Sequence, residues 1–117
     1  MKLEIDHRIL HIRLSTWEKL LTVRRNDIEI PISKIQTVEL VPKLNWRGWR
    51  QIRWPGTYIP GIIKAGSYWT PSGWEFWYVH KNQPCLIISG NLGKFKKVIL
   101  GLPQASSWHK QLLKIIR

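Results

Sequence analysis

The residues of this chain that could bind a charged partner are concentrated in one stretch, NWRGWRQIRWPGTYIPG, which spans residues 45–61. It contains three tryptophans, three arginines and two Pro-Gly pairs, and no carboxylate balances its charge. Indole rings alternating with cations suit two kinds of anionic partner. On a membrane, tryptophan prefers the headgroup region, and each cation near an anionic surface contributes about 1 kcal/mol. On single-stranded nucleic acid, bases stack on the indoles while arginines contact the phosphates.

The candidate binding residues are the cations and tryptophans in and just before this stretch. A structural role is an equally weighted interpretation, because arginines also stack on tryptophans within one molecule and a long loop can fold back over its own rings. The candidate residues for ligand or partner binding are Lys43, Trp46, Arg47, Trp49, Arg50, Arg53 and Trp54.

A second basic cluster consists of Lys94, Lys96 and Lys97, at the start of a predicted strand. Lysines in such a position also discourage edge-to-edge aggregation, and this structural interpretation is favoured over binding. The chain has eight tryptophans, more than a single core readily buries. Some of them should therefore be exposed, which leaves a homo-oligomer with a tryptophan-rich interface as an alternative.

Groups that could catalyse a reaction are scarce. Only seven carboxylates are present, and most fall on outward positions of predicted strands. His7 and His11 would lie about 13 Å apart on one strand, too far to share a metal ion. Cys85, the only cysteine in the sequence, has no assignable His/Asn partner and is interpreted as a small core residue. We therefore expect a non-enzymatic protein without a catalytic residue, metal site or cofactor.

Length and charge limit the class of protein. With 117 residues the chain is expected to form one domain, residues 1–117, around a single core. Its start lacks the uninterrupted apolar segment of a secretory signal, and no apolar run approaches the roughly 20 residues that span a bilayer. These features and the lone cysteine predict a cytoplasmic protein, with a peripheral position at the inner membrane surface as an alternative. The net charge of +12 favours an anionic partner without identifying it.

The start of the chain predicts a hairpin followed by a short helix. Residues 3–6 and 9–15 alternate in polarity and should pair around a two-residue turn, although the turn lacks Asn-Gly or Asp-Gly. Ser15 is followed three residues later by Glu18, the spacing of a capping box, so a short helix should begin there.

Further strands follow with short turns between them. Residues 27–32 alternate isoleucine with polar residues and include a proline, which predicts an edge strand. A strand at residues 34–41 comes next. The last four strands follow one another closely, which predicts an antiparallel meander. Their expected ranges are 62–70, 74–80, 85–89 and 94–100.

The final segment changes its apolar period from two to that of a helix. Trp108 and the apolar residues after it recur at helical spacing, so an amphipathic helix is predicted. Pro103 precedes it, and Ser106 or Ser107 should cap it. With Trp108 as its largest core anchor, this helix should cover the open end of a strongly bent sheet or barrel.

The stretch RWPGTYIPGIIKAGSYWTPSGWEFWYVH, residues 53–80, resembles small bacterial proteins that are related in fold to pleckstrin homology (PH) domains. The likeness lies in the succession Pro-Gly-Thr, Pro-Gly, Gly-Ser-Tyr and Glu-Phe-Trp, and it extends loosely to residues 17–35 and to the closing helix. It implies a mostly β, PH-like bent antiparallel sheet or barrel of about seven strands, capped by a C-terminal amphipathic α-helix. The Pro-Gly pairs would then be turns that shape the barrel.

The resemblance implies no particular ligand, because folds of this type bind lipid headgroups, phosphopeptides, proline-rich segments and partner domains. The basic loop by which many PH domains hold phosphoinositides has no counterpart in the short turn at His7 and Arg8. We therefore expect a non-enzymatic binding module that engages an anionic ligand, membrane surface or protein partner through its basic and aromatic surface. A homo-oligomeric assembly protein is the first alternative, and a protein that binds single-stranded nucleic acid is the second and less favoured one.

Overall fold

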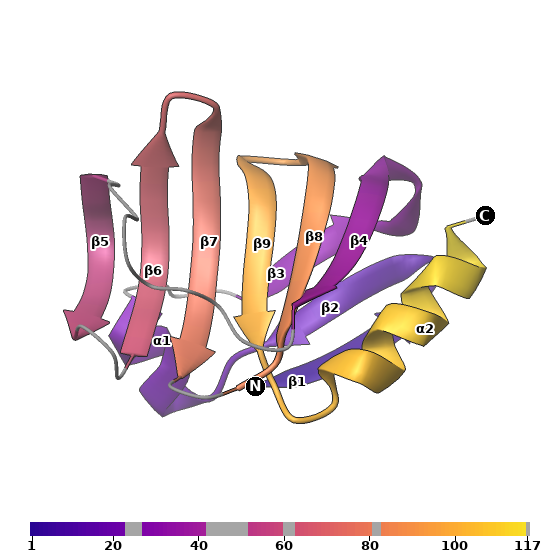
Figure 1. Cartoon of the computed structure of the whole chain (residues 1–117), viewed down its shortest axis with the longest axis horizontal. Coiled ribbons are helices and arrows are strands. Elements are labelled where there is room, and N and C mark those ends of the chain that lie inside the picture. Colours follow the sequence, from indigo (N-terminus) through magenta and orange to yellow (C-terminus); the bar gives the residue numbers. More distant parts are fainter. Residues whose placement is uncertain (23–26, 42–51, 60–62, 81–82, 117) are drawn as a thin grey trace.

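A computed structural model of the chain describes residues 1–22, 27–41, 52–59, 63–80 and 83–116. These residues form a three-stranded sheet, a six-stranded sheet, two α-helices and one 3-10 helix (Figure 1). In chain order the elements are β1 (Lys2–Asp6), β2 (Ile9–Arg13), α1 (Thr16–Thr22), β3 (Ile28–Pro31), the 3-10 helix η1 (Ile32–Lys34), β4 (Ile35–Val41), β5 (Ile52–Ile59), β6 (Ile63–Thr70), β7 (Gly73–His80), β8 (Cys85–Leu92), β9 (Phe95–Gly101) and α2 (Ala105–Ile115). The described part of the protein is therefore mostly β-structure with a C-terminal helix, as predicted.

β1 and β2 form the predicted opening hairpin, with Asp6 paired to Ile9. The two turn residues, His7 and Arg8, have φ angles of 51° and 61°. Positive φ at both central residues is the signature of a type I′ turn, whose twist matches that of the paired strands. The turn thus forms without glycine, although the left-handed region costs a non-glycine residue about 1–2 kcal/mol.

The next two segments also confirm their predictions. Ser15 and Glu18 exchange the two hydrogen bonds of a capping box, and α1 begins directly after Ser15. β3 lies at the edge of the three-stranded sheet, whose order is β1-β2-β3. Pro31 ends this strand opposite Ile9. A proline has no N–H to donate, so it is tolerated where no further strand must pair.

The prediction of an antiparallel meander is wrong for one pairing in the six-stranded sheet, whose order is β4-β8-β9-β7-β6-β5. β6 with β7 and β8 with β9 form antiparallel pairs, but β7 lies beside β9 and runs parallel to it, with Phe76 opposite Val98. β8 pairs with β4 instead. The alternation of apolar residues assigns a side chain to one face of a sheet, but it does not determine which strand is the neighbour. Apolar residues alternate similarly in β8 and β9, so the sequence does not show which of the two strands lies beside β7.

The first Pro-Gly pair lies within a strand, which corrects the expectation of a turn. Pro55 and Gly56 belong to β5, the edge strand of the six-stranded sheet. The register between β5 and β6 shifts between Arg53 and Gly56. Proline is compatible with such an edge position and with an irregular ladder, because it cannot supply a backbone donor.

The main hydrophobic core lies between the two sheets and α2. Its fully buried members include Leu10 and Ile30 from the three-stranded sheet, Phe76 and Val98 from the six-stranded sheet, and Leu112 from α2. In the part of the chain that the structure describes, no ladder joins the two sheets. They pack as two layers without a closed barrel in these residues, so the PH-like form of the bent sheet or barrel stays a prediction. η1 connects β3 of the three-stranded sheet to β4 of the six-stranded sheet, and each sheet has its own edge strands.

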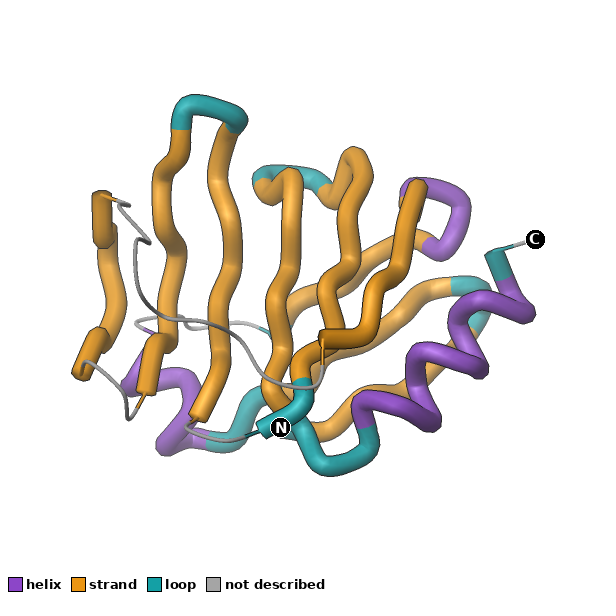
Figure 2. Tube along the Cα trace, in the orientation of Figure 1, coloured by secondary structure: helices purple, strands orange, loops and turns teal. Residues whose placement is uncertain are grey.

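α2 forms as predicted and packs along β4 and β8, whereas α1 packs against β5 and β6 (Figure 2). Two details differ from expectation. Gln104, without a side-chain hydrogen bond, occupies the N-cap position, so neither Ser106 nor Ser107 caps the helix. Trp108 is only half-buried, and Leu112 is the fully buried anchor. Among the described residues, neither helix has the length and apolar character needed to cross a membrane.

Candidate binding surface

The candidate residues predicted from the sequence fall into two groups. Lys43, Trp46, Arg47, Trp49 and Arg50 lie outside the described residues, so their role stays a prediction. Arg53 and Trp54 belong to β5, and the backbone of Arg53 pairs with that of Tyr68 in β6. The described residues bring a different set of cations and aromatic rings together, at one end of the six-stranded sheet.

Two turns and η1 lie at the same end of the sheet, which we call the turn end (Figure 2). One turn joins β6 to β7, and the other joins β8 to β9. The backbone of Lys34 in η1 lies directly against β8, because a Cβ atom added to Gly90 would lie 2.3 Å from the Lys34 carbonyl oxygen. Only glycine permits that approach, which fixes η1 beside the β8–β9 turn.

Tryptophans flank the β6–β7 turn. Trp69 and Trp74 are directly opposite each other in the ladder, so their side chains lie on the same face of the sheet. Thr70 Oγ1 donates a hydrogen bond to the Gly73 carbonyl oxygen at 2.8 Å and accepts one from the Ser72 N–H at 3.2 Å, which fixes the turn between them. Trp69 is 42% exposed, whereas Trp74 is half-buried against the main core.

Lys94 connects the second turn to the Trp74 ring. Its Nζ lies 4.6 Å from the centroid of the Trp74 ring and 5.8 Å from that of Phe95. Both distances are within the range of a cation–π contact, which contributes about 0.5–1 kcal/mol at an exposed site. The β8–β9 turn is thereby held against the β6–β7 hairpin.

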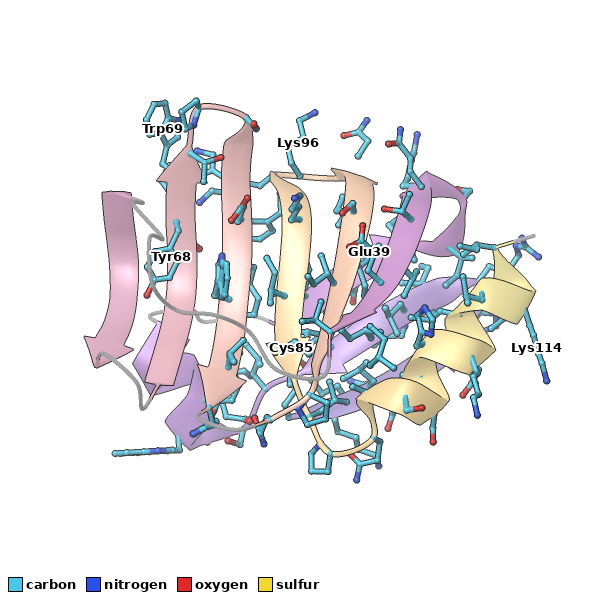
Figure 3. All side chains as sticks on the ribbon, viewed as in Figure 1. Glu39, Tyr68, Trp69, Cys85, Lys96 and Lys114 are labelled. Carbon is cyan, nitrogen blue, oxygen red and sulfur yellow. The ribbon has the colours of Figure 1, made fainter. Side chains whose placement is uncertain are left out.

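Four exposed lysines surround this end, and we call them the lysine rim: Lys34, Lys94, Lys96 and Lys97. The ladder between β7 and β9 shifts register at Lys96, because Trp74 pairs with Phe95 while Glu75 pairs with Lys97. The extra residue in a β-bulge is commonly re-aimed away from the regular pleat. Lys96 projects at the same end of the sheet as Trp69 (Figure 3). A Cβ atom on Gly73 would lie 2.7 Å from Lys96 Cγ, so the glycine leaves room for the lysine stem.

No ion pair involves the lysine rim among the described residues. Glu75, which faces Lys97 in the ladder, is buried and accepts a hydrogen bond from Trp77 Nε1 at 3.0 Å. The ion pairs between described residues involve the three-stranded sheet, its flanking residues and α1, as with Arg13 Nε and Glu4 Oε2 at 2.8 Å. Arg13 and Lys2 lower the pKa of Glu4 accordingly.

The sequence separates charge in the same way. Residues 1–31 contain six Lys and Arg against five Asp and Glu. Residues 32–117, which include η1, the six-stranded sheet and α2, contain 13 of the 19 cations and only two of the seven carboxylates. The excess positive charge therefore belongs to the part of the chain that carries the lysine rim.

The potential nucleophile is buried. Cys85 lies in a second apolar cluster with Tyr68, Trp77, Val79 and Ile99, which confirms its interpretation as a core residue. Its Sγ donates a weak hydrogen bond to the Gln83 carbonyl oxygen at 3.5 Å. Burial raises the pKa of the Cys85 thiol to about 11, so the reactive thiolate is disfavoured.

The histidines have separate surroundings. His7 lies near Asp6, and His11 Nδ1 lies 3.6 Å from Glu29 Oε1. His80 Nε2 lies 3.2 Å from the Tyr78 hydroxyl. In the described ranges, no three side chains of His, Cys, Asp or Glu cluster as metal ligands would.

Trp69 and Trp74 were missed as candidate binding residues. The signal was present, because a Pro-Ser-Gly turn flanked by tryptophans places both rings across one hairpin. Lys94, Lys96 and Lys97 were noticed, but the sequence did not show that another turn lies beside them. The contact between Lys94 and Trp74 depends on the parallel pairing of β7 with β9, which the meander prediction excluded.

Comparison of the chain with family models, curated proteins and solved structures gave no match.

Proposed function

We propose that the protein is a non-enzymatic binding module whose basic and aromatic surface engages an anionic partner. The observation that supports this most directly is the lysine rim, in which four exposed lysines have no ion-pair partner among the described residues and lie around the end of the sheet that also carries the exposed indole of Trp69. Unpaired surface cations create a field that attracts anions and speeds their encounter with the protein. Trp69 adds apolar contact once the partner has arrived.

The proposed mechanism has two steps. Long-range attraction by the +12 chain concentrates the anionic partner at the surface, and aromatic contact then anchors it. The seven candidates within residues 43–54 remain a proposed part of this surface, because they add cations and tryptophans to the same chain. We also propose a PH-like family relationship and a cytoplasmic setting, with a place at the inner membrane surface. Two packed sheets with a C-terminal helix are compatible with that relationship.

The absence of catalytic activity is part of the proposal. The buried Cys85 thiol and the dispersed histidines support it, because nucleophilic catalysis needs an accessible nucleophile close to a base. Self-assembly stays an alternative proposal, supported by the 67% exposure of Trp17 on α1.

Two anionic probes test the proposed function. The full chain should bind vesicles that contain phosphatidylglycerol, or a single-stranded DNA oligonucleotide, at low salt. Binding should weaken steeply at moderate salt, because neighbouring cations and anions are then screened. Vesicles of phosphatidylcholine alone serve as the uncharged control. If neither anionic probe binds at low salt, the proposed function is wrong.

A further inference from the structure

We infer that the lysine rim and Trp69 form a docking surface for an anionic phospholipid bilayer, with the turn end of the six-stranded sheet facing the headgroups. This inference rests on the proposed function and names the class of partner. The surface is built from η1, β6, β9 and the β8–β9 turn, and it is distinct in sequence from the candidates of residues 43–54.

The kind and placement of the cations favour a lipid surface. All four members of the rim are lysines, and a lysine ammonium acts as a mobile point charge. Recognition of a single phosphate is better served by the rigid fork of arginine. The rim also spans several elements, namely η1, the β8–β9 turn and β9. Point charges spread over an end match the diffuse negative potential of a bilayer.

The aromatic content of the surface also favours a lipid bilayer as the partner. Trp69 is 42% exposed, so part of its ring packs on the protein while the rest can enter the interfacial zone where tryptophan is favoured. Trp74 is half-buried, and Lys94 lies over its ring. A single indole can insert into the interfacial zone, whereas single-stranded nucleic acid is held by successive rings that each stack on a base.

The distribution of charge determines the orientation of docking. The three-stranded sheet has nearly balanced charges and forms its own ion pairs, as between Arg13 and Glu4. Attraction to an anionic surface therefore acts mainly on the part of the chain from residue 32 onward, and within it Trp69 and Lys96 project at the turn end of the six-stranded sheet. This end should meet the bilayer first.

Flotation with vesicles of phosphatidylcholine, with and without phosphatidylglycerol, tests this inference. The rim variant is Lys94→Ala/Lys96→Ala/Lys97→Ala in the full chain. The matched control, Lys2→Ala/Lys110→Ala/Lys114→Ala, removes the same charge from exposed positions on β1 and α2. Circular dichroism and a urea titration show whether each variant remains folded. Trp69→Phe is a fourth protein, which retains an aromatic ring at the same position.

The rim variant should lose on the order of 100-fold in its partition onto anionic vesicles, because each lysine near the surface contributes about a fivefold factor. The control should lose less than about tenfold, since its lysines act only from a distance. Trp69→Phe should bind measurably more weakly than the wild-type protein.

Three results would overturn the inference while leaving the proposed function in place. One is an equal loss of binding to anionic vesicles by the folded rim and control variants. Another is a loss of vesicle binding only in an Arg47→Ala/Arg50→Ala/Arg53→Ala variant. The third is wild-type protein that binds the DNA oligonucleotide but not the vesicles. If the wild-type protein binds neither probe, the proposed function fails together with the inference.

Discussion

Ser15 and Glu18 hydrogen-bond each other in both directions: the Ser15 N–H donates to Glu18 Oε1 at 2.8 Å, and the Glu18 N–H donates to Ser15 Oγ at 3.2 Å. The second carboxylate oxygen of Glu18 accepts from the α-ammonium of Met1 in a largely buried ion pair. Burial opposes the charged form of Glu18, but these hydrogen bonds outweigh it and lower its pKa. Burial and the Glu18 charge raise the pKa of the neighbouring Tyr78 to about 12. This carboxylate thus joins the Met1 ammonium, α1 and Tyr78 of β7.

Replacement of Glu18 by Gln should lower the free energy of unfolding by about 1–2 kcal/mol at pH 7, because the charge-assisted bonds are lost while the cap geometry is retained. A carboxylate with a lowered folded pKa stabilises the native state above its unfolded pKa, and this contribution is lost as the pH falls through the folded pKa. The difference in the free energy of unfolding between wild type and variant should therefore become smaller as the pH falls below about 5. Urea unfolding at several pH values measures it. A gap that is unchanged down to pH 3 would contradict the assignment.

Local signals predicted much of the fold because they act within a few residues. The Ser15–Glu18 spacing predicted a cap that forms, and the Pro31 position predicted an edge strand that is found at an edge. Strand order depends on contacts between distant segments, and the alternation of apolar and polar residues along a strand carries no information about it. The parallel neighbour of β7 was missed for that reason, whereas the strand at residues 52–59 was missed because its Pro-Gly pair was interpreted as a turn.

The candidate surface was harder to predict than the fold. Trp74 and Lys94 are 20 positions apart in the sequence, and they meet only because β9 inserts between β7 and β8. Charge content alone favoured residues 43–54, where cations and tryptophans are adjacent in the chain. A surface assembled by topology leaves no such local signature, which is why Trp69 was not among the candidates.

Two glycines in the β8–β9 hairpin should respond very differently to substitution by alanine. Gly90 and Gly93 both have positive φ, 153° and 77°, so each alanine is strained. A Cβ on Gly93 would meet no atom within 4 Å, whereas one on Gly90 would lie 2.3 Å from the Lys34 carbonyl oxygen and 2.9 Å from the Gln36 nitrogen. Gly93→Ala should cost about 1–2 kcal/mol, and Gly90→Ala about 3 kcal/mol or more, because backbone atoms must move. Urea titrations of both variants provide the comparison, and equal costs would show that η1 does not press on β8.

The thiol of Cys85 should be protected in the native protein. Its side chain is fully buried, and burial raises its pKa to about 11, against an ordinary value of 9.0. At pH 8 the thiolate fraction is then about 100-fold smaller than for an ordinary thiol, and the reagent has no direct access.

A colorimetric disulfide reagent should therefore label the native protein only as fast as Cys85 becomes exposed by opening or unfolding, while protein in concentrated urea should react at once. Cys85→Ala supplies the blank. Destabilising variants such as Glu18→Gln should accelerate labelling in proportion to their loss of unfolding free energy if exposure requires global unfolding. Labelling at a rate independent of stability would indicate local opening of the second apolar cluster around Tyr68 and Trp77, and rapid stoichiometric labelling of the native protein would contradict the burial of this thiol.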